Sequence, residues 1–329
     1  MKLRSAIPLR PAGWHHWIAR NYLGKPDQGE LLRIKFPTLR SVMNAGLNEL
    51  AYRAGSLRSY RLTSLNVEVT NHCNLRCTIC PVNRGMERKK RFIDPALFRK
   101  VIDATPSLEF ILPFQWGEPL LHPEIGGMIR YAAARRLRVF LTTNGTLLDE
   151  ERCEELCTSG LTRLTISIDG NEGTHAEIRD VPLQEIRERT AVLRRIRDRL
   201  RSPMRIDVSM VLDTETRAAY AEYLEEWCNL VDRVQAIPRL DSSERHTRCR
   251  ELWRGTLVVL ADGRVTPCCP DFEGKLAIGS ARESSPDEIF RGGAMRRLRE
   301  AHVSGCFPEI CRFCGEYDAR DLGVSYRFR

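Results

Sequence analysis

The sequence predicts an α/β protein built around a partial, TIM-like (β/α)6 barrel that is open on one side. From Leu65 onward, short apolar runs alternate with amphipathic stretches of helical period, which is typical of a parallel sheet made of βα units. After about Leu240 the alternation ends, and two short strands flanking Asp262-Gly263 indicate a β-hairpin in a small, cysteine-rich C-terminal module. The repeats alone leave a doubly wound open sheet as the alternative, because both folds use the same βα unit.

The points at which the βα repeats begin and end divide the sequence into three expected segments. We expect a basic, partly helical N-terminal extension over residues 1–62, a barrel core over 63–240 and the C-terminal β-hairpin/helix module over 241–329. The expected strands are residues 64–70, 109–113, 138–143, 163–168, 205–211 and 233–238, and the expected helices are 38–54, 95–105, 122–136, 149–159, 183–200 and 216–230. Because parallel strands end at one edge of the barrel, functional residues are expected directly after the strands.

Positive charge is concentrated near the N-terminal end. Residues 1–62 hold 11 Lys and Arg against 3 Asp and Glu, so +8 of the net charge of +9 lies there. This segment can meet an anionic partner, such as a phosphate, a nucleotide-linked substrate, a membrane surface or RNA, or it can be a solvated basic surface. No apolar run approaches the ~18 residues of a membrane span, and Pro8 and Pro11 interrupt a signal-peptide core, so a cytoplasmic location is expected.

The twelve cysteines are interpreted as metal ligands first, because disulfides are rare in a reducing cytosol. Cys73, Cys77 and Cys80 follow the first expected strand at C-x3-C-x2-C spacing. Three thiolates on one loop can hold three irons of a cubane cluster and leave the fourth iron open to a cofactor. Zinc is the alternative, but structural zinc sites are closed by four ligands, and His72 is poorly placed as a fourth because it directly precedes Cys73.

The cysteine loop resembles that of the radical S-adenosylmethionine (radical SAM) superfamily, and further motifs within residues 64–240 agree. Gln115-Trp116-Gly117-Glu118-Pro119 is similar to the family's Gly-Gly-Glu-Pro segment, which receives the amino group of S-adenosylmethionine (SAM), although Trp116 replaces the first glycine. Thr143-Asn144-Gly145 and Ser167-Ile168-Asp169-Gly170 resemble the motifs after the third and fourth strands, and Ile79 stands where the family places a hydrophobic residue beside the adenine. The resemblance therefore implies SAM contacts from Ile79, Gly117, Glu118, Asn144, Ser167 and Asp169.

A second cysteine set lies in the C-terminal module. Cys249, Cys268, Cys311 and Cys314 can close a site around a structural zinc or a fully ligated 4Fe-4S cluster, and spacing does not decide between them. The set resembles the short form of the SPASM or twitch domain, which implies one auxiliary 4Fe-4S cluster. Cys268 is expected to ligate because it completes the family's G-x4-C pattern, with its neighbour Cys269 as the alternative.

The resemblance implies reductive cleavage of SAM to a 5'-deoxyadenosyl radical, which abstracts a substrate hydrogen atom. An auxiliary cluster makes two-electron oxidation the natural outcome, and a flavodoxin or ferredoxin is the expected reductant. The oxidation needs a base, for which Asp271 is the candidate.

Two substrate classes are open. One is a small, possibly anionic carbohydrate, aminocyclitol or nucleotide-linked metabolite, which the basic extension favours. The other is a peptide or protein side chain. A third reading, from a different functional class, is a non-enzymatic zinc protein that binds RNA through residues 1–62, although nucleic acid is the least expected partner.

Overall fold

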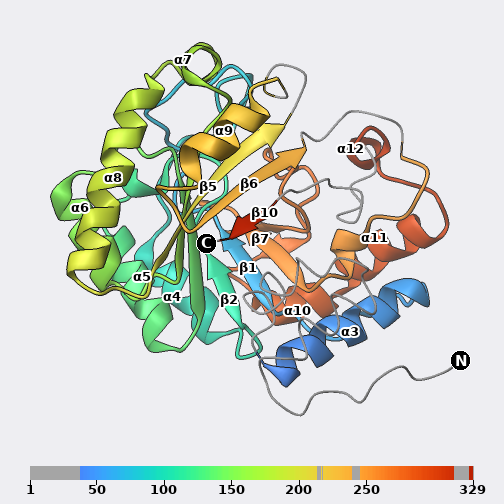
Figure 1. The fold of residues 1–329 in the computed structure, drawn as a ribbon. Coiled ribbons are helices and arrows are strands. Elements are labelled where there is room, and N and C mark those ends of the chain that lie inside the picture. Colours follow the sequence, from blue (N-terminus) through green and yellow to red (C-terminus); the bar gives the residue numbers. More distant parts are fainter. Residues whose placement is uncertain (1–37, 213–215, 217, 239–244, 315–325, 329) are drawn as a thin grey trace, which may run out of the picture. The chain divides into compact units, whose positions relative to one another are not determined.

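The computed structural model describes residues 38–329 apart from 213–215, 217, 239–244, 315–325 and 329 (Figure 1). Most of the expected basic extension, residues 1–37, therefore lies outside the described residues. The chain divides into two units, Met1–Leu47 and Asn48–Arg329, and helix α3 (Leu39–Arg53) begins in the first and ends in the second. The expected helix at 38–54 is thereby confirmed.

One ten-stranded sheet forms the centre of the second unit in the described part of the chain. Its order is β10-β6-β5-β4-β3-β2-β1-β7-β8-β9. Strands β1 to β6 are neighbours in sequence order and pair in parallel. This sequential order is that of a barrel rather than of a doubly wound sheet, in which the order reverses at a switch point. The partial barrel is confirmed. The strands are β1 (Ser64–Val67), β2 (Phe110–Leu112), β3 (Arg138–Thr143), β4 (Arg163–Ser167), β5 (Arg205–Leu212), β6 (Arg233–Pro238), β7 (Thr256–Val259), β8 (Arg264–Thr266), β9 (Gly279–Ser280) and β10 (Tyr326–Phe328).

Helices cover one face of the parallel strands, where α4 (Pro95–Asp103), α5 (Ile125–Ala134), α6 (Glu150–Thr158) and α8 (Leu183–Arg199) lie in Figure 1. Their first turns are capped locally. Asp94 accepts the amide of Ala96 before α4, and Asp149 accepts the amide of Arg152 before α6. Such caps satisfy backbone donors that have no partner inside the helix. The apolar face of α4, which includes Phe98 and Val101, is buried as the amphipathic pattern requires.

Helix α9 (Tyr220–Trp227) is shorter than the expected helix at 216–230. Helix α7 (Glu172–Arg179) lies in the connection after β4, where the sequence pattern predicts no helix. Asn171 caps it by accepting the amide of Thr174, and Asp180 ends it in a left-handed conformation at φ 57°. Eight residues are too short for an amphipathic period to stand out from the neighbouring α8.

The C-terminal module continues the core sheet. The expected hairpin is confirmed as β7 and β8, which pair antiparallel, but β7 also pairs in parallel with β1, with Leu65 opposite Leu257. Residues Asn48–Arg329 accordingly form one compact unit. The boundary at residue 240 marks a change in the repeat and stays a prediction as a domain boundary. The module also contains α10 (Pro286–Arg291), α11 (Gly293–Val303) and α12 (Glu309–Arg312).

Candidate active site

Three cysteines share the loop that follows β1. Burial raises the pKa of the Cys73, Cys77 and Cys80 thiols, and the charge of each thiolate raises the pKa of another member of the set. Such mutual repulsion acts only between groups that lie close together. The structure therefore brings the three sequence-predicted thiols into one cluster of donors.

The loop is anchored by backbone contacts. The amide of Thr78 donates to the carbonyl of Ile178 in α7 at 2.8 Å, and the amide of Cys80 donates to the carbonyl of Cys77 at 3.2 Å. The side chain of Asn83 donates to the carbonyl of Leu75 at 3.1 Å. The unexpected helix α7 is thus part of what holds the thiols in place.

Two cations that the sequence interpretation missed lie near the thiols. Arg179 lowers the pKa of Cys77 and Cys80, and Lys90 lowers the pKa of Cys73 and Cys80. Lys90 also donates to the backbone oxygen of Asn71 at 2.9 Å. Both cations favour the thiolate form, which is the form that ligates metal. The sequence did contain a signal for Arg179. Arg179 stands four residues after His175 in the segment that follows the Asp169-Gly170 turn, so a short helix predicted there would have drawn attention to both side chains.

Gly117 allows the segment after β2 to approach the cysteine loop. A Cβ atom at residue 117 would lie 2.6 Å from the backbone oxygens of both Thr70 and His72, and its φ of +102° also favours glycine. The amide of Glu118 then donates to the oxygen of His72 at 2.8 Å. The position predicted to meet the cofactor is therefore one where only glycine fits.

The Glu118 carboxylate is buried at this junction, with 1% of its surface exposed. It accepts hydrogen bonds from the Thr143 hydroxyl and the Asn144 amide at 2.7 Å and from the Leu120 amide at 3.0 Å. Burial raises its pKa, although these donors oppose the shift. A carboxylate has about four acceptor positions, so one remains on Oε2 for a further donor such as an ammonium group.

Asn144 connects the end of β3 to the cysteine loop. Its side-chain amide donates to Asn74 Oδ1 at 2.9 Å, and its Oδ1 accepts from the amide of Thr146 at 3.0 Å. Asn74 in turn donates to the Thr146 hydroxyl at 2.8 Å. Asn74 was missed by the sequence interpretation, and its place inside the cysteine motif was the available signal.

Asp169 is fully buried after β4 and is paired with Arg179. Its Oδ2 accepts from Arg179 Nε at 2.8 Å, and its Oδ1 accepts from the amide of Val211 at 3.0 Å. Burial disfavours charge on Arg179, but Asp169 and Cys77 offset it and the pKa of Arg179 is raised. Ser167 and Ile79, the other predicted SAM contacts, are half-buried. Glu118, Asn144 and Asp169 thus lie close to the cysteine loop, and Ser167 is the last residue of β4.

His175 holds the backbone of Asp169 in place and is expected to make the stability of the folded protein depend on pH. Its Nδ1 accepts the Asp169 amide at 3.1 Å, and burial lowers its pKa from 6.5 to about 3. The unfolded chain protonates this imidazole below about pH 6.5 but the folded chain only near pH 3, so acid favours unfolding. We expect His175 alone to lower the free energy of unfolding by about 1 kcal/mol between pH 7.5 and pH 5.5.

Urea unfolding of the wild type and of His175→Gln at both pH values measures this contribution. Glutamine can still accept the amide but binds no proton. An equal acid sensitivity in the two proteins would contradict the assignment.

The later cysteines form a second set. Burial raises the pKa of Cys249 to about 11, of Cys311 to about 12 and of Cys268 well above its ordinary value. The charge of Cys314 raises the pKa of Cys249 and Cys311, and both of these thiols raise that of Cys268. The four expected ligands therefore lie together. Cys269 is exposed and directly follows Cys268, so it remains the alternative ligand.

Asp271, the candidate base, lies in a turn of the C-terminal module. Its carboxylate is 1% exposed and accepts hydrogen bonds from the Thr266 hydroxyl and from the amides of Lys275 and Leu276. These contacts close the turn between β8 and residue 276. A general base must reach the proton that it removes, so the role of Asp271 as the base stays a prediction.

The donors fit the expected groups. Clustered thiols are the ligands that iron–sulfur clusters take, with one cysteine for each iron. In the described residues, no three His, Cys, Asp or Glu side chains surround a single metal-ion position. A four-iron cluster does not require such convergence, because its irons are separate. The remaining acceptor position of Glu118 Oε2 fits a cofactor that carries an ammonium group.

Comparisons with known proteins agree with this site. The radical SAM superfamily matches residues 67–226, and an iron-sulfur cluster-binding domain, SPASM, matches residues 249–315. The AdoMet-dependent heme synthase of Methanosarcina barkeri is 39% identical over 119 residues, which cover 35% of this chain and 34% of that protein. The chain thus spans about a third of the length of the first curated relatives that it matches.

Other similarities extend over more of the chain. The S-adenosyl-L-methionine-dependent 2-deoxy-scyllo-inosamine dehydrogenase of Niallia circulans is 23% identical, covering 76% of this chain and 91% of that protein. The structure of BtrN in complex with AdoMet and 2-DOIA is similar with a TM-score of 0.57 at 19% identity, covering 80% of this chain and 96% of BtrN. The structure of Streptococcus suis SuiB bound to precursor peptide SuiA gives a TM-score of 0.59 at 13% identity, and the match covers 84% of this chain and 76% of SuiB. These two structures show the fold.

The matched families imply the cofactors that the two cysteine sets fit, namely SAM, its 4Fe-4S cluster and an auxiliary 4Fe-4S cluster. In the described part of the chain, no helix is long and apolar enough to span a membrane. The family match also removes the support for a non-enzymatic zinc protein. The chain belongs to the radical SAM superfamily and carries a C-terminal SPASM-type iron-sulfur cluster-binding domain.

Proposed function

We propose that the protein is a radical SAM dehydrogenase that oxidises a small carbohydrate, aminocyclitol or nucleotide-linked metabolite by two electrons. Cys73, Cys77 and Cys80 hold the SAM-binding cluster. The auxiliary cluster is held by Cys249, Cys268, Cys311 and Cys314. When bound, SAM and its cluster supply a hydrogen-atom abstractor and the auxiliary cluster supplies a one-electron acceptor. A flavodoxin or ferredoxin supplies the reducing electron.

The protein's own residues bind and orient the cofactor. Gly117 lets the segment after β2 pack against the cysteine loop and contacts the cofactor through its backbone, and Glu118 accepts the ammonium group on the remaining acceptor position of Oε2. Ser167 and Asp169 meet the ribose, Ile79 packs beside the adenine, and Asn144 holds the cysteine loop through Asn74. Arg179 forms an ion pair with the buried Asp169 and favours the thiolate forms of Cys77 and Cys80.

The observation that carries the proposal is the single set of four coupled thiols in the C-terminal module, which fits one auxiliary electron acceptor. Two similarities support the substrate class. The aminocyclitol dehydrogenase of Niallia circulans is matched over 91% of its length, and BtrN is matched over 96%. A maturase that acts on a peptide is the rival function, which the similarity to SuiB supports at the level of the fold.

Anaerobic purification with iron and sulfide analysis tests the cofactors. We expect about eight irons per chain, from two four-iron clusters. Incubation with dithionite, SAM and a panel of aminocyclitols then tests the reaction, for which we expect 5'-deoxyadenosine, methionine and a ketone product. SAM cleavage that is stimulated by peptides and never by a polyol or aminocyclitol would favour the maturase.

Cys314→Ala separates the two clusters. We expect the variant to lose about four irons, to cleave SAM still and to form less than a hundredth of the wild-type product, because the auxiliary site loses one of its four ligands. Cys306→Ala is the matched control, since Cys306 is exposed and outside both sets. Unimpaired product formation by Cys314→Ala would remove the auxiliary cluster from the reaction.

A further inference from the structure

Two neighbouring side chains after β2 donate hydrogen bonds to one backbone oxygen in the auxiliary-cluster module. Gln115 Nε2 and Trp116 Nε1 lie 3.2 Å and 3.1 Å from the carbonyl oxygen of Cys269. That residue is adjacent to Cys268, the proposed auxiliary ligand. Gly117, the residue after Trp116, is the proposed cofactor contact. The two proposed cofactor sites are therefore joined through three consecutive residues, Gln115, Trp116 and Gly117.

Both donors are held in place by further contacts. Gln115 Oε1 accepts from Asn66 Nδ2 of β1 at 2.8 Å, which sets the orientation of the amide so that Nε2 faces Cys269. The Trp116 ring packs edge to face on Phe272, with centroids 6.0 Å apart and planes at 77°. Pre-oriented donors lose little freedom when they bind, so the pair can fix the position of the carbonyl.

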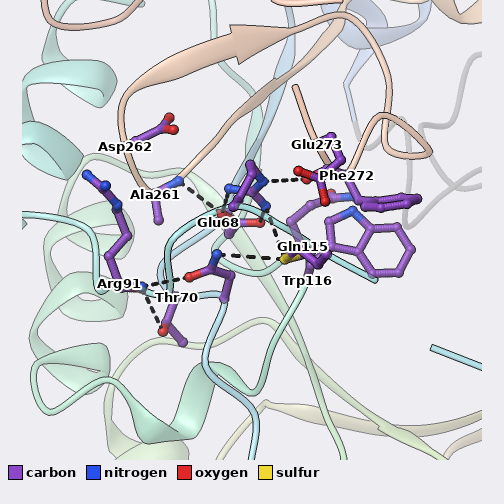
Figure 2. Close-up of polar contacts among 12 residues, drawn as sticks. Glu68, Thr70, Arg91, Gln115, Trp116, Ala261, Asp262, Phe272 and Glu273 are labelled. Atoms are coloured by element: carbon purple, nitrogen blue, oxygen red, sulfur yellow. Dashed lines mark hydrogen bonds and ion pairs between the residues drawn. The ribbon is translucent and has the colours of Figure 1, made fainter. Parts of the chain in front are cut away.

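Trp116 is the position at which this chain departs from the Gly-Gly-Glu-Pro pattern that its motif resembles. A glycine has no side chain with which to reach Cys269. The tryptophan therefore adds a contact between the β2 loop and the module, and its indole lies beside Phe272 in Figure 2. This contact is a property of this chain's own sequence.

We propose that Gln115 and Trp116 are positioning residues that hold the Cys268–Cys269 turn, and with it the auxiliary cluster, at a fixed place beside the SAM site. The inference rests on the proposed function in one respect, the assignment of Cys268 as a ligand of that cluster. Hydrogen bonds behind metal ligands orient the ligands, and their loss typically changes affinity or activity by about 10- to 100-fold.

Two conservative variants test the proposal. Gln115→Glu keeps an oxygen that accepts from Asn66 but turns a second oxygen, in place of a donor, toward the Cys269 carbonyl. Trp116→Phe keeps an aromatic ring beside Phe272 but removes the N–H donor. Tyr131→Phe is the control. Tyr131 lies on the outer helix α5, and its hydroxyl donates to Asp103 at 2.6 Å. The variant therefore also removes one aromatic donor but leaves both cysteine sets untouched.

The first readout needs no substrate. In the anaerobically reconstituted, dithionite-reduced protein, the magnetic interaction between the two clusters is measured by electron paramagnetic resonance. We expect a single well-defined interaction in the wild type and in Tyr131→Phe. In Gln115→Glu/Trp116→Phe we expect a broadened or weakened one. The second readout is the amount of 5'-deoxyadenosine formed per product, which we expect to rise about 10-fold in the double variant.

An unchanged interaction and an unchanged ratio in the double variant would overturn the proposal. The outcomes separate it from the proposed function. If the variants disturb the cluster interaction but no aminocyclitol is oxidised, the positioning role stands and the substrate assignment falls. If the wild type oxidises an aminocyclitol and the double variant matches it in both readouts, the positioning role falls alone.

Discussion

Replacement of Cys77 by alanine is expected to abolish reductive cleavage of SAM, with a loss of at least about a thousandfold. The thiol is one of three donors whose charges act on one another, and it is the most buried of them, with 9% of its surface exposed. Removal of one thiolate leaves two ligands for a cluster that already has one open iron, and such a cluster has no stable attachment. Cys73→Ala and Cys80→Ala are expected to give the same result.

The measurement is the formation of 5'-deoxyadenosine and methionine with dithionite, together with the iron and sulfide content. About four irons should be lost while the auxiliary cluster remains. Cys153→Ala is the matched control, because Cys153 is fully buried and lies on α6 outside both cysteine sets. It separates the loss of a ligand from the loss of a buried sulfur atom. Cleavage retained by all three loop variants would overturn the cluster assignment.

Replacement of Arg88 by methionine is expected to give the largest loss of stability. Arg88 pairs with Glu68 through two hydrogen bonds of 2.8 Å and 2.7 Å, and the side chains are 5% and 0% exposed. Glu68 also accepts the amide of Ala261, as Figure 2 shows, and Arg88 donates to the carbonyl of Phe272. The variant leaves a buried carboxylate without its cation, which costs about 3–5 kcal/mol.

The double variant Glu68→Gln/Arg88→Met distinguishes an unpaired charge from lost packing. It removes both charges, so we expect it to recover most of the stability that Arg88→Met loses in urea unfolding. A double variant as unstable as the single one would contradict this explanation.

The Glu68–Arg88 pair also shows which part of the site local pattern could not reveal. Glu68 follows β1, Arg88 follows the cysteine loop, and Ala261 follows β7, so the hydrogen bond from Ala261 to this ion pair exists only because β7 pairs with β1. Along the chain, Arg88 is about twenty positions from Glu68, and Ala261 is about two hundred positions from it. Amphipathic period and turn residues report only on neighbours within a few positions, so neither could predict that contact.

The catalytic base and the roles of α7 illustrate the same limit. Asp271 was predicted from its place after Cys268, but its accessibility depends on whether the turn folds over it, and the turn does. His175 and Arg179 gain their roles from a short helix that packs against the cysteine loop. Their chemistry was visible in the sequence, but their neighbours were not.

By itself the sequence determined the βα order, the hairpin and the grouping of the cysteines into two sets. It also predicted the first residue of each strand from β1 to β6, with the exception of β2. These features depend on hydrophobic period, turn residues and ligand spacing, which are local. Only the tertiary structure decided that β7 extends the core sheet, that Glu118 and Asp169 are buried and hydrogen-bonded, and that Gln115 and Trp116 reach the carbonyl of Cys269. These features depend on contacts between distant segments, whose strength comes from burial and exclusion of water, and such contacts exist only after the chain has folded.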